Sequence, residues 1–268
     1  MALPEPSDSA TALVTGASAG IGESIARELG SRGHGITLVA RREERLRTLA
    51  GELSQGHGIR AEAIAVDLGD PAARDRLAEQ IAGLGLEVQI LVNNAGFGGS
   101  GNVADSDRKR LLAMLRVNCE AVLDLQARYL PSMVERGRGA VLNIASMAAF
   151  QPIPGTATYA ATKAFVLSLS EAVHEELKGT GVTLTAVCPG PVKTEFTRAA
   201  GIEHAEEQLP DLFWMASDAI AKAAVEGAES GKRVVVPGLL NRAGALTGHH
   251  TPRVLALPIV KRIWRQAL

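Results

Sequence analysis

The sequence contains only two cysteines, Cys119 and Cys188, among its 268 residues. Two cysteines do not suggest a disulfide framework or a metal site, so we expect a cytoplasmic protein. The formal net charge is -1, which offers no electrostatic basis for binding nucleic acid. No apolar run is long enough to span a membrane, and the first residues lack the basic and apolar regions of a secretory leader.

Aromatic residues are also scarce, at 3%, yet the rest of the composition is that of a soluble globular protein. Apolar residues make up 46% of the chain and charged residues 21%, which disfavours disorder as the main state. Without repeats or linkers, we expect one domain over residues 1–268. It would carry a flexible tail at residues 1–10 and a C-terminal extension at residues 241–268.

Short apolar runs alternate with helical stretches along the chain. Runs that are apolar throughout are typical of parallel strands buried on both faces. Strand–helix alternation therefore predicts a doubly wound parallel α/β sheet. The predicted strands are Thr11–Thr15, Ile36–Ala40, Ala61–Val66, Val88–Val92, Ala140–Ala145, Val182–Val187 and Arg233–Val236. The predicted helices span 20–32, 42–55, 71–83, 107–135, 157–179 and 216–229.

Distinctive residues follow six of the predicted strands. Ligands in such sheets bind beyond the carboxyl ends of the strands, so these residues mark one crevice. They are Gly16, Arg41, Asp67, Asn94, Ser146 and Pro189.

The first predicted strand runs into a glycine-rich turn, residues 15–22. Gly16, Gly20 and Gly22 allow a tight turn and close approach of a ligand to the backbone. The helix that follows offers free N–H groups to a pyrophosphate. The spacing differs from the usual dinucleotide fingerprint, and a glycine-rich turn without a ligand is the alternative.

The second predicted strand ends at Arg41 and Arg42, where NAD-binding sites usually place an acidic residue. Guanidinium groups match phosphate geometry, so we favour NADP(H), with NAD(H) as the second choice. The two arginines can instead be solvated and paired with nearby glutamates. After the third strand, Asp67 is expected either to accept the adenine amino hydrogen or to cap the helix near Pro71.

Tyr159 and Lys163 are four residues apart and thus share one face of a predicted helix. A neighbouring ammonium group is expected to lower the tyrosine pKa towards the range useful for proton transfer. Ser146 can hydrogen-bond the same substrate oxygen, and Asn118 can hold a water that links Lys163 to solvent. Each residue alone also has an ordinary interpretation: a surface pair, a cap and a polar helix face.

These motifs together resemble the short-chain dehydrogenase/reductase family over about residues 10–240, and within it the NADP(H)-preferring members. The resemblance rests on residues 15–22, Asp67, Asn93–Gly96, Asn118, Ser146, residues 159–163 and residues 189–194. It implies a Rossmann-like three-layer α/β/α domain with about seven parallel strands. It also implies an oxidoreductase that interconverts a carbonyl and a secondary alcohol.

The resemblance implies a catalytic tetrad of Asn118, Ser146, Tyr159 and Lys163, and no metal. The implied cofactor-binding residues are Gly16, Ser18, Ala19, Gly20, Ile21, Gly22, Arg41, Arg42, Asp67, Leu68, Asn94, Ala95, Gly96, Tyr159, Lys163, Pro189, Gly190, Val192 and Thr194. A homodimer or homotetramer is implied, with residues 107–135 and 157–179 at the subunit contact. A non-catalytic NADP(H)-binding sensor or scaffold on this fold is the alternative function.

Substrate specificity is expected to come from residues 97–101, 147–155 and 194–215, which hold much of the scarce aromatic content. They predict an apolar small-molecule substrate under a lid, or simple packing on the protein or on a second subunit. The C-terminal extension is basic and amphipathic, and Pro258 interrupts any single helix there. Packing within the protein or its oligomer is favoured for it over contact with a membrane surface.

Overall fold

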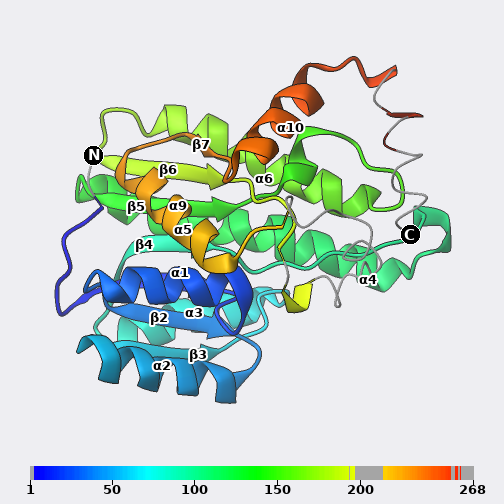
Figure 1. Cartoon of the computed structure of the whole chain (residues 1–268). Helices are drawn as coiled ribbons and strands as arrows, with labels where there is room; N and C mark the ends of the chain where they lie inside the picture. Colours follow the sequence, from blue (N-terminus) through cyan, green and yellow to red (C-terminus); the bar gives the residue numbers. More distant parts are fainter. Residues whose placement is uncertain (1–2, 193, 197–213, 255–256, 259, 261–268) are drawn as a thin grey trace.

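A computed structural model describes residues 3–192, 194–196, 214–254, 257–258 and 260. Its centre is a parallel sheet of seven strands in the order β3-β2-β1-β4-β5-β6-β7 (Figure 1). This confirms the predicted fold class. The strands are β1 (Ala10–Thr15), β2 (Ile36–Ala40), β3 (Ala61–Ala65), β4 (Glu87–Asn93), β5 (Gly139–Ile144), β6 (Val182–Val187) and β7 (Val234–Val235).

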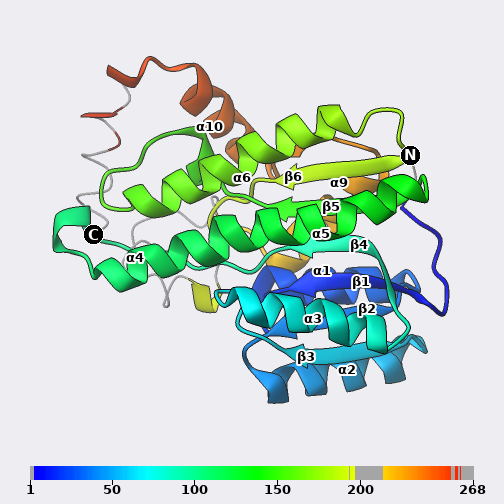
Figure 2. The ribbon, with the colours of Figure 1, turned by 180° about the vertical axis from the view of Figure 1, so that it is seen from behind.

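Helices cover both faces of the sheet, and alternate strand residues point to opposite layers. On one face, α1 (Gly20–Ser31), α2 (Glu43–His57) and α9 (Ser217–Glu229) pack on side chains such as Val14 and Leu38 (Figure 1). On the other, α3 (Pro71–Gly83), α5 (Ala121–Glu135) and α6 (Ala157–Glu176) cover the sheet (Figure 2). Burial from both sides is the reason why the central strands are largely apolar, whereas the edge strand β3 is mostly partly exposed and contains Glu62.

The stretch predicted as one helix over 107–135 is divided into three parts. Helix α4 (Arg108–Leu115) leads into a π-helical turn, η2 (Arg116–Glu120), and then into α5. Such turns interrupt the regular backbone hydrogen bonding and are frequent at functional sites. This one contains Asn118. The helical periodicity of the chain gave no sign that the helix would be interrupted here.

The described residues of both terminal segments contact the rest of the domain. The predicted flexible tail is held to the body, because Leu3 is buried in the main core and Ala10 already belongs to β1. The C-terminal extension contains an unpredicted helix, α10 (Leu239–His250), in which Ala245 is buried. Val260 packs with Ile153 further along, so the described part of the extension contacts the protein itself.

Two short 3-10 helices complete the described elements, η1 (Val103–Asp105) and η3 (Met147–Phe150). Within the described residues, no helix combines the length and the hydropathy that a membrane crossing requires.

Candidate active site

The glycine-rich turn after β1 is shaped by contacts that leave no room for side chains. Gly16 and Gly20 have φ values of +66° and +61°, a left-handed conformation that favours glycine. A Cβ on Gly22 would lie 2.4 Å from Asn94 Nδ2, which itself donates to the Thr15 carbonyl at 2.9 Å. Asn94 therefore ties the turn to the end of β4.

Helix α1 begins in this turn with its backbone donors uncapped by the preceding side chain. Ala19 occupies the N-cap position and makes no side-chain cap hydrogen bond. The first N–H groups of a helix need an acceptor from elsewhere, and the helix dipole favours an anion there. The glycines and this helix start thus fit the pyrophosphate of a dinucleotide.

The end of β2 places Arg42 against the same turn. Its Nε and Nη2 atoms donate to Ser18 Oγ at 3.1 and 2.9 Å, and its Nη1 atom pairs with Glu195. The sequence offered, as an alternative, that these arginines pair with glutamates close to them in the chain. This is wrong for Arg42, whose acidic partner lies 153 residues away. Arg41 is exposed beside it.

The alternative expectation for Asp67, a helix cap, is wrong. Asp70 caps α3 by accepting a hydrogen bond from the Ala72 N–H, whereas Asp67 accepts one from the Gly69 N–H at 2.9 Å. Leu68 is buried, and its carbonyl accepts a hydrogen bond from Arg74. Asp67 stays free of a helix-capping role at the crevice edge.

Tyr159, Lys163 and Ser146 come together where α6 passes the end of β5. Lys163 is only 6% exposed, and its ammonium donates to the Ile144 carbonyl at 2.7 Å and lies 5.9 Å from the centre of the Tyr159 ring. A surface pair is therefore the wrong interpretation of these two residues. Ser146 Oγ accepts a hydrogen bond from Ala148 N–H, so it is a cap, and the same hydroxyl also hydrogen-bonds the Tyr159 side chain.

Burial dominates the acid–base properties of this cluster. It raises the pKa of Tyr159 to about 12, against a smaller lowering by the Ser146 hydroxyl. It also lowers the pKa of Lys163 to about 8, because the charged ammonium is poorly solvated there. The expectation of a lowered tyrosine pKa is thus wrong for this arrangement of protein groups.

The Asn118 side chain hydrogen-bonds other residues of the protein, at Phe97 and Thr162. Its Oδ1 accepts from the Phe97 N–H at 3.1 Å, and its Nδ2 donates to the Phe97 carbonyl and to Thr162 Oγ1, both at 3.0 Å. Asn118 is 1% exposed, so the alternative that it lies on a solvent-facing polar side of a helix is wrong. A Cβ on Gly96 would lie 3.0 Å from Asn118 Oδ1 and 3.7 Å from Lys163 Nζ, which places Gly96 beside the cluster, whereas the Ala95 N–H donates to Thr15 Oγ1 at the glycine-rich turn.

The segment after β6 closes the crevice from the other side. Val192 forms a parallel bridge with Met215, and Thr194 packs at Gly20, where an added Cβ would lie 3.2 Å from Thr194 Cγ2. Pro189 is buried, and a Cβ on Gly190 would overlap Asn241 of α10. Residue 193 and residues 197–213, most of the third expected substrate segment, lie outside the described residues, as do 255–256, 259 and 261–268 of the extension.

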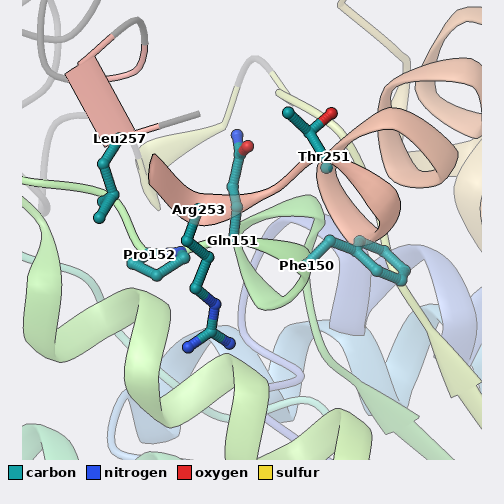
Figure 3. Close-up of a pocket in the computed structure, with 7 residues that line it drawn as sticks. Phe150, Gln151, Pro152, Thr251, Arg253 and Leu257 are labelled. Atoms are coloured by element: carbon teal, nitrogen blue, oxygen red, sulfur yellow. The ribbon is translucent and has the colours of Figure 1, made fainter. Parts of the chain in front are cut away.

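A small hollow of about 120 Å³ lies between the segment after η3 and the C-terminal extension (Figure 3). Its walls are largely apolar, with one guanidinium group from Arg253. The sequence pattern gave no sign that Arg253 lines this hollow, that Asn241 contacts Gly190 or that Glu195 pairs with Arg42, because local sequence does not show which distant element a side chain contacts. The residues that line the hollow are Phe150, Gln151, Pro152, Gly248, Thr251, Arg253 and Leu257.

Across the described part of the chain, no three His, Cys, Asp or Glu side chains converge as a metal site would require.

Phe196 lies against the catalytic candidate Tyr159, with ring centres 5.6 Å apart and tilted by 51°. The cluster is thereby shielded on one side by an aromatic ring.

Three features define a dinucleotide-dependent oxidoreductase: the doubly wound sheet, the glycine-rich turn of residues 15–22, hereafter the glycine cradle, and the pairing of partly buried Tyr159 with buried Lys163. The family model "short chain dehydrogenase" matches residues 10–205, and the chain belongs to this family of NAD(P)-dependent short-chain dehydrogenases/reductases. This confirms the family resemblance.

Two curated relatives show the range of activities around this chain. A very-long-chain 3-oxoacyl-CoA reductase from Anas platyrhynchos is 38% identical over 200 residues, which are 72% of this chain and 63% of that protein. The match thus spans less than two thirds of the relative. Sulfoacetaldehyde reductase 2 from Chromohalobacter salexigens is 36% identical over 74% of this chain and 79% of its own.

A solved structure supports the same assignment. The short-chain dehydrogenase from Sphingobium yanoikuyae in complex with NADPH superposes with a TM-score of 0.79 at 36% identity. The superposition covers 89% of this chain and 92% of that one.

Proposed function

We propose that this protein is an NADP(H)-dependent reductase that converts an apolar ketone or a 3-oxoacyl-like substrate into a secondary alcohol. The observation that carries the proposal is the pairing of Tyr159 with the buried Lys163 beside Ser146, at the same sheet edge as the glycine cradle. A sensor or scaffold that only binds the cofactor has no need of such a pair.

NADPH supplies the hydride that adds to the carbonyl carbon. Ser146, which hydrogen-bonds Tyr159 in this structure, donates its hydroxyl hydrogen to the carbonyl oxygen of the bound substrate and holds that oxygen in place. Tyr159 then gives its phenolic proton to that oxygen, so that the carbonyl becomes an alcohol. The Lys163 ammonium stabilises the phenolate that remains, and Asn118 keeps the main chain around Phe97 and Thr162 in position.

The protonation state of Tyr159 fits the proton-donating step. A tyrosine with a pKa of about 12 carries its proton throughout the physiological range, which suits proton donation to a carbonyl. Oxidation of an alcohol would need the phenolate form, which burial disfavours. Reduction is therefore the reaction for which the protein groups are already in the right protonation state.

The preference for NADP(H) is supported by the arginines after β2. Arg42 and Ser18 bring donors to the crevice edge, and Arg41 adds a second positive charge. The dehydrogenase from Sphingobium yanoikuyae, which is similar over most of this chain, contains NADPH. We assign the adenosine 2′-phosphate to Ser18, Arg41 and Arg42, and the nicotinamide end to the region of Gly96, Val192 and Thr194.

The substrate proposal is supported by the hollow in Figure 3. Phe150, Pro152 and Leu257 provide apolar walls, while the Arg253 guanidinium can attract an anionic group. A 3-oxoacyl thioester combines an apolar chain with a phosphate-bearing carrier and would use both features. Both curated relatives are reductases named for anionic substrates, an acyl-CoA and a sulfonate.

We also propose a homodimer or homotetramer. Four large apolar side chains are 37–47% exposed on α4, α5 and α6, where they line one groove. They are Leu112, Leu115, Leu123 and Phe165. Leu123→Glu should reduce the molecular mass measured by light scattering, whereas Leu84→Glu, on a partly exposed residue after α3, should not; a wild-type monomer would refute this.

The test of the main proposal is a titration of the purified chain with NADPH and NADH, followed by turnover of apolar ketones, 3-oxoacyl thioesters and small polar ketones. We expect tighter binding of NADPH and the fastest turnover with one of the first two classes. Preference for NADH, or for small polar ketones, contradicts the cofactor or the substrate assignment. Tight NADPH binding without turnover of any compound supports the sensor instead.

A further inference from the structure

Glu195 holds two arginines that lie beside the glycine cradle. Its Oε2 is 2.6 Å from Arg42 Nη1, and its Oε1 is 2.8 Å from Arg45 Nη1. The two guanidinium groups keep the pKa of Glu195 below its usual value, so the carboxylate is charged at neutral pH. None of the assigned steps of catalysis uses this residue.

Arg42 is the link between Glu195 and the cofactor cradle. The guanidinium edge opposite to Glu195 is occupied by Ser18, which lies in the turn between Gly16 and Gly20. An anion bound next to Ser18 needs donors from the same guanidinium group. Arg42 cannot offer its Nη1 hydrogens fully to both the carboxylate and a phosphate.

Glu195 is held close to this cradle by its own chain. It follows Thr194, whose methyl group packs at Gly20 in the cradle. Thr194 Oγ1 also accepts a hydrogen bond from the Phe196 N–H at 3.2 Å, which fixes the chain on both sides of Glu195. These contacts hold the Glu195 carboxylate at the edge of the proposed cofactor site.

We propose that Glu195 competes with the 2′-phosphate of NADP(H) for Arg42 and is therefore a residue that sets the preference between NADPH and NADH. The proposal rests on the proposed NADP(H) site. Arg42 and Glu195 are 44% and 50% exposed, and pairs this exposed are weak, so a phosphate can replace the carboxylate. Arg45 retains Glu195 after the exchange, and the carboxylate still repels the phosphate at short range.

The expected consequence is specific for one cofactor. NADH has no 2′-phosphate and leaves the Arg42–Glu195 pair in place, so its affinity is independent of the carboxylate. NADPH must displace it, so removing the charge of Glu195 should strengthen NADPH binding by about three- to fivefold, the upper part of the range of an exposed ion pair. Salt should reduce this gain, because exposed charges are screened.

The experiment compares full-length wild type, Glu195→Gln and Glu43→Gln by titration with NADPH and NADH at low and high salt. Glu43 also pairs with an arginine of α2, Arg47, so its variant is a matched control for loss of one carboxylate. We expect the dissociation constant for NADPH to fall about three- to fivefold only in Glu195→Gln, with that for NADH unchanged.

An unchanged ratio of NADPH to NADH affinity in Glu195→Gln overturns the proposal. Weaker NADPH binding also overturns it, because Glu195 would then orient Arg42 for the phosphate rather than compete with it. Wild type that binds neither cofactor, or prefers NADH, refutes the proposed function itself, and that result is read from the wild-type titration alone.

Discussion

The catalytic cluster and the arginine cluster lie at the same edge of the sheet but are built from opposite kinds of contact. Lys163 and Asn118 are almost fully buried, and each makes hydrogen bonds to the main chain. Arg42, Arg45 and Glu195 are about half exposed and are joined by ion pairs. Buried polar groups define one geometry and shift pKa values, whereas exposed pairs can be exchanged at little cost.

The largest effect is expected for Tyr159→Phe. Loss of the proton donor should lower kcat by about 10²–10⁴-fold while the dissociation constant for NADPH stays the same. The other tyrosine of the chain, Tyr129, is buried without a hydrogen-bond partner for its hydroxyl and serves as the control. If steady-state kinetics show equal activity for Tyr159→Phe and Tyr129→Phe, the catalytic assignment fails.

Asn118→Ala tests the rigidity of the buried cluster. It removes the partners of the Phe97 N–H, the Phe97 carbonyl and Thr162 Oγ1, which costs about 1–3 kcal/mol for buried groups left unsatisfied. Urea unfolding should show this loss. Asn102→Ala, on an exposed residue that pairs with Asp105, should change stability little, and equal effects of the two substitutions would contradict the comparison.

The pH dependence of reduction tests the buried ammonium. Lys163 is charged below its pKa of about 8 and loses its proton as the pH rises through that value, while Tyr159 remains protonated up to about 12. The kcat/KM for carbonyl reduction should therefore be constant below about pH 8 and fall about tenfold per unit above it. A profile that rises through this range would show that the phenolate, not the phenol, is the active form.

The smallest effect is expected in the exposed cluster. Arg42→Ala should raise the dissociation constant for NADPH by about fivefold at low salt and leave that for NADH unchanged, because only NADPH carries the 2′-phosphate. Fluorescence titration measures both dissociation constants. Arg47→Ala, on an exposed arginine of α2, is the control. If Arg42→Ala weakens NADH binding as much as NADPH binding, Arg42 does not act through the 2′-phosphate.

The sequence was sufficient for much of the architecture because the responsible signals are local. Seven apolar runs predicted the strands, and the glycines at 16, 20 and 22 marked the turn that the structure places at the start of α1. The spacing of Tyr159 and Lys163 placed both on α6. The roles of these residues in catalysis and cofactor binding remain predictions.

Tertiary structure decided the properties that depend on distant neighbours. Burial gives Tyr159 a pKa of about 12 rather than the lowered value expected from Lys163, since desolvation outweighs the hydrogen bond with Ser146. The hydrogen bonds of Asn118 to Phe97 and Thr162, the packing of α10 on η3 and the Arg42–Glu195 pair join segments far apart in the chain. By itself the sequence determined the order of strands and helices and the motifs at their ends, because periodicity and glycine spacing act over a few residues, whereas solvation, protonation and ion-pair partners arise only when distant segments pack together.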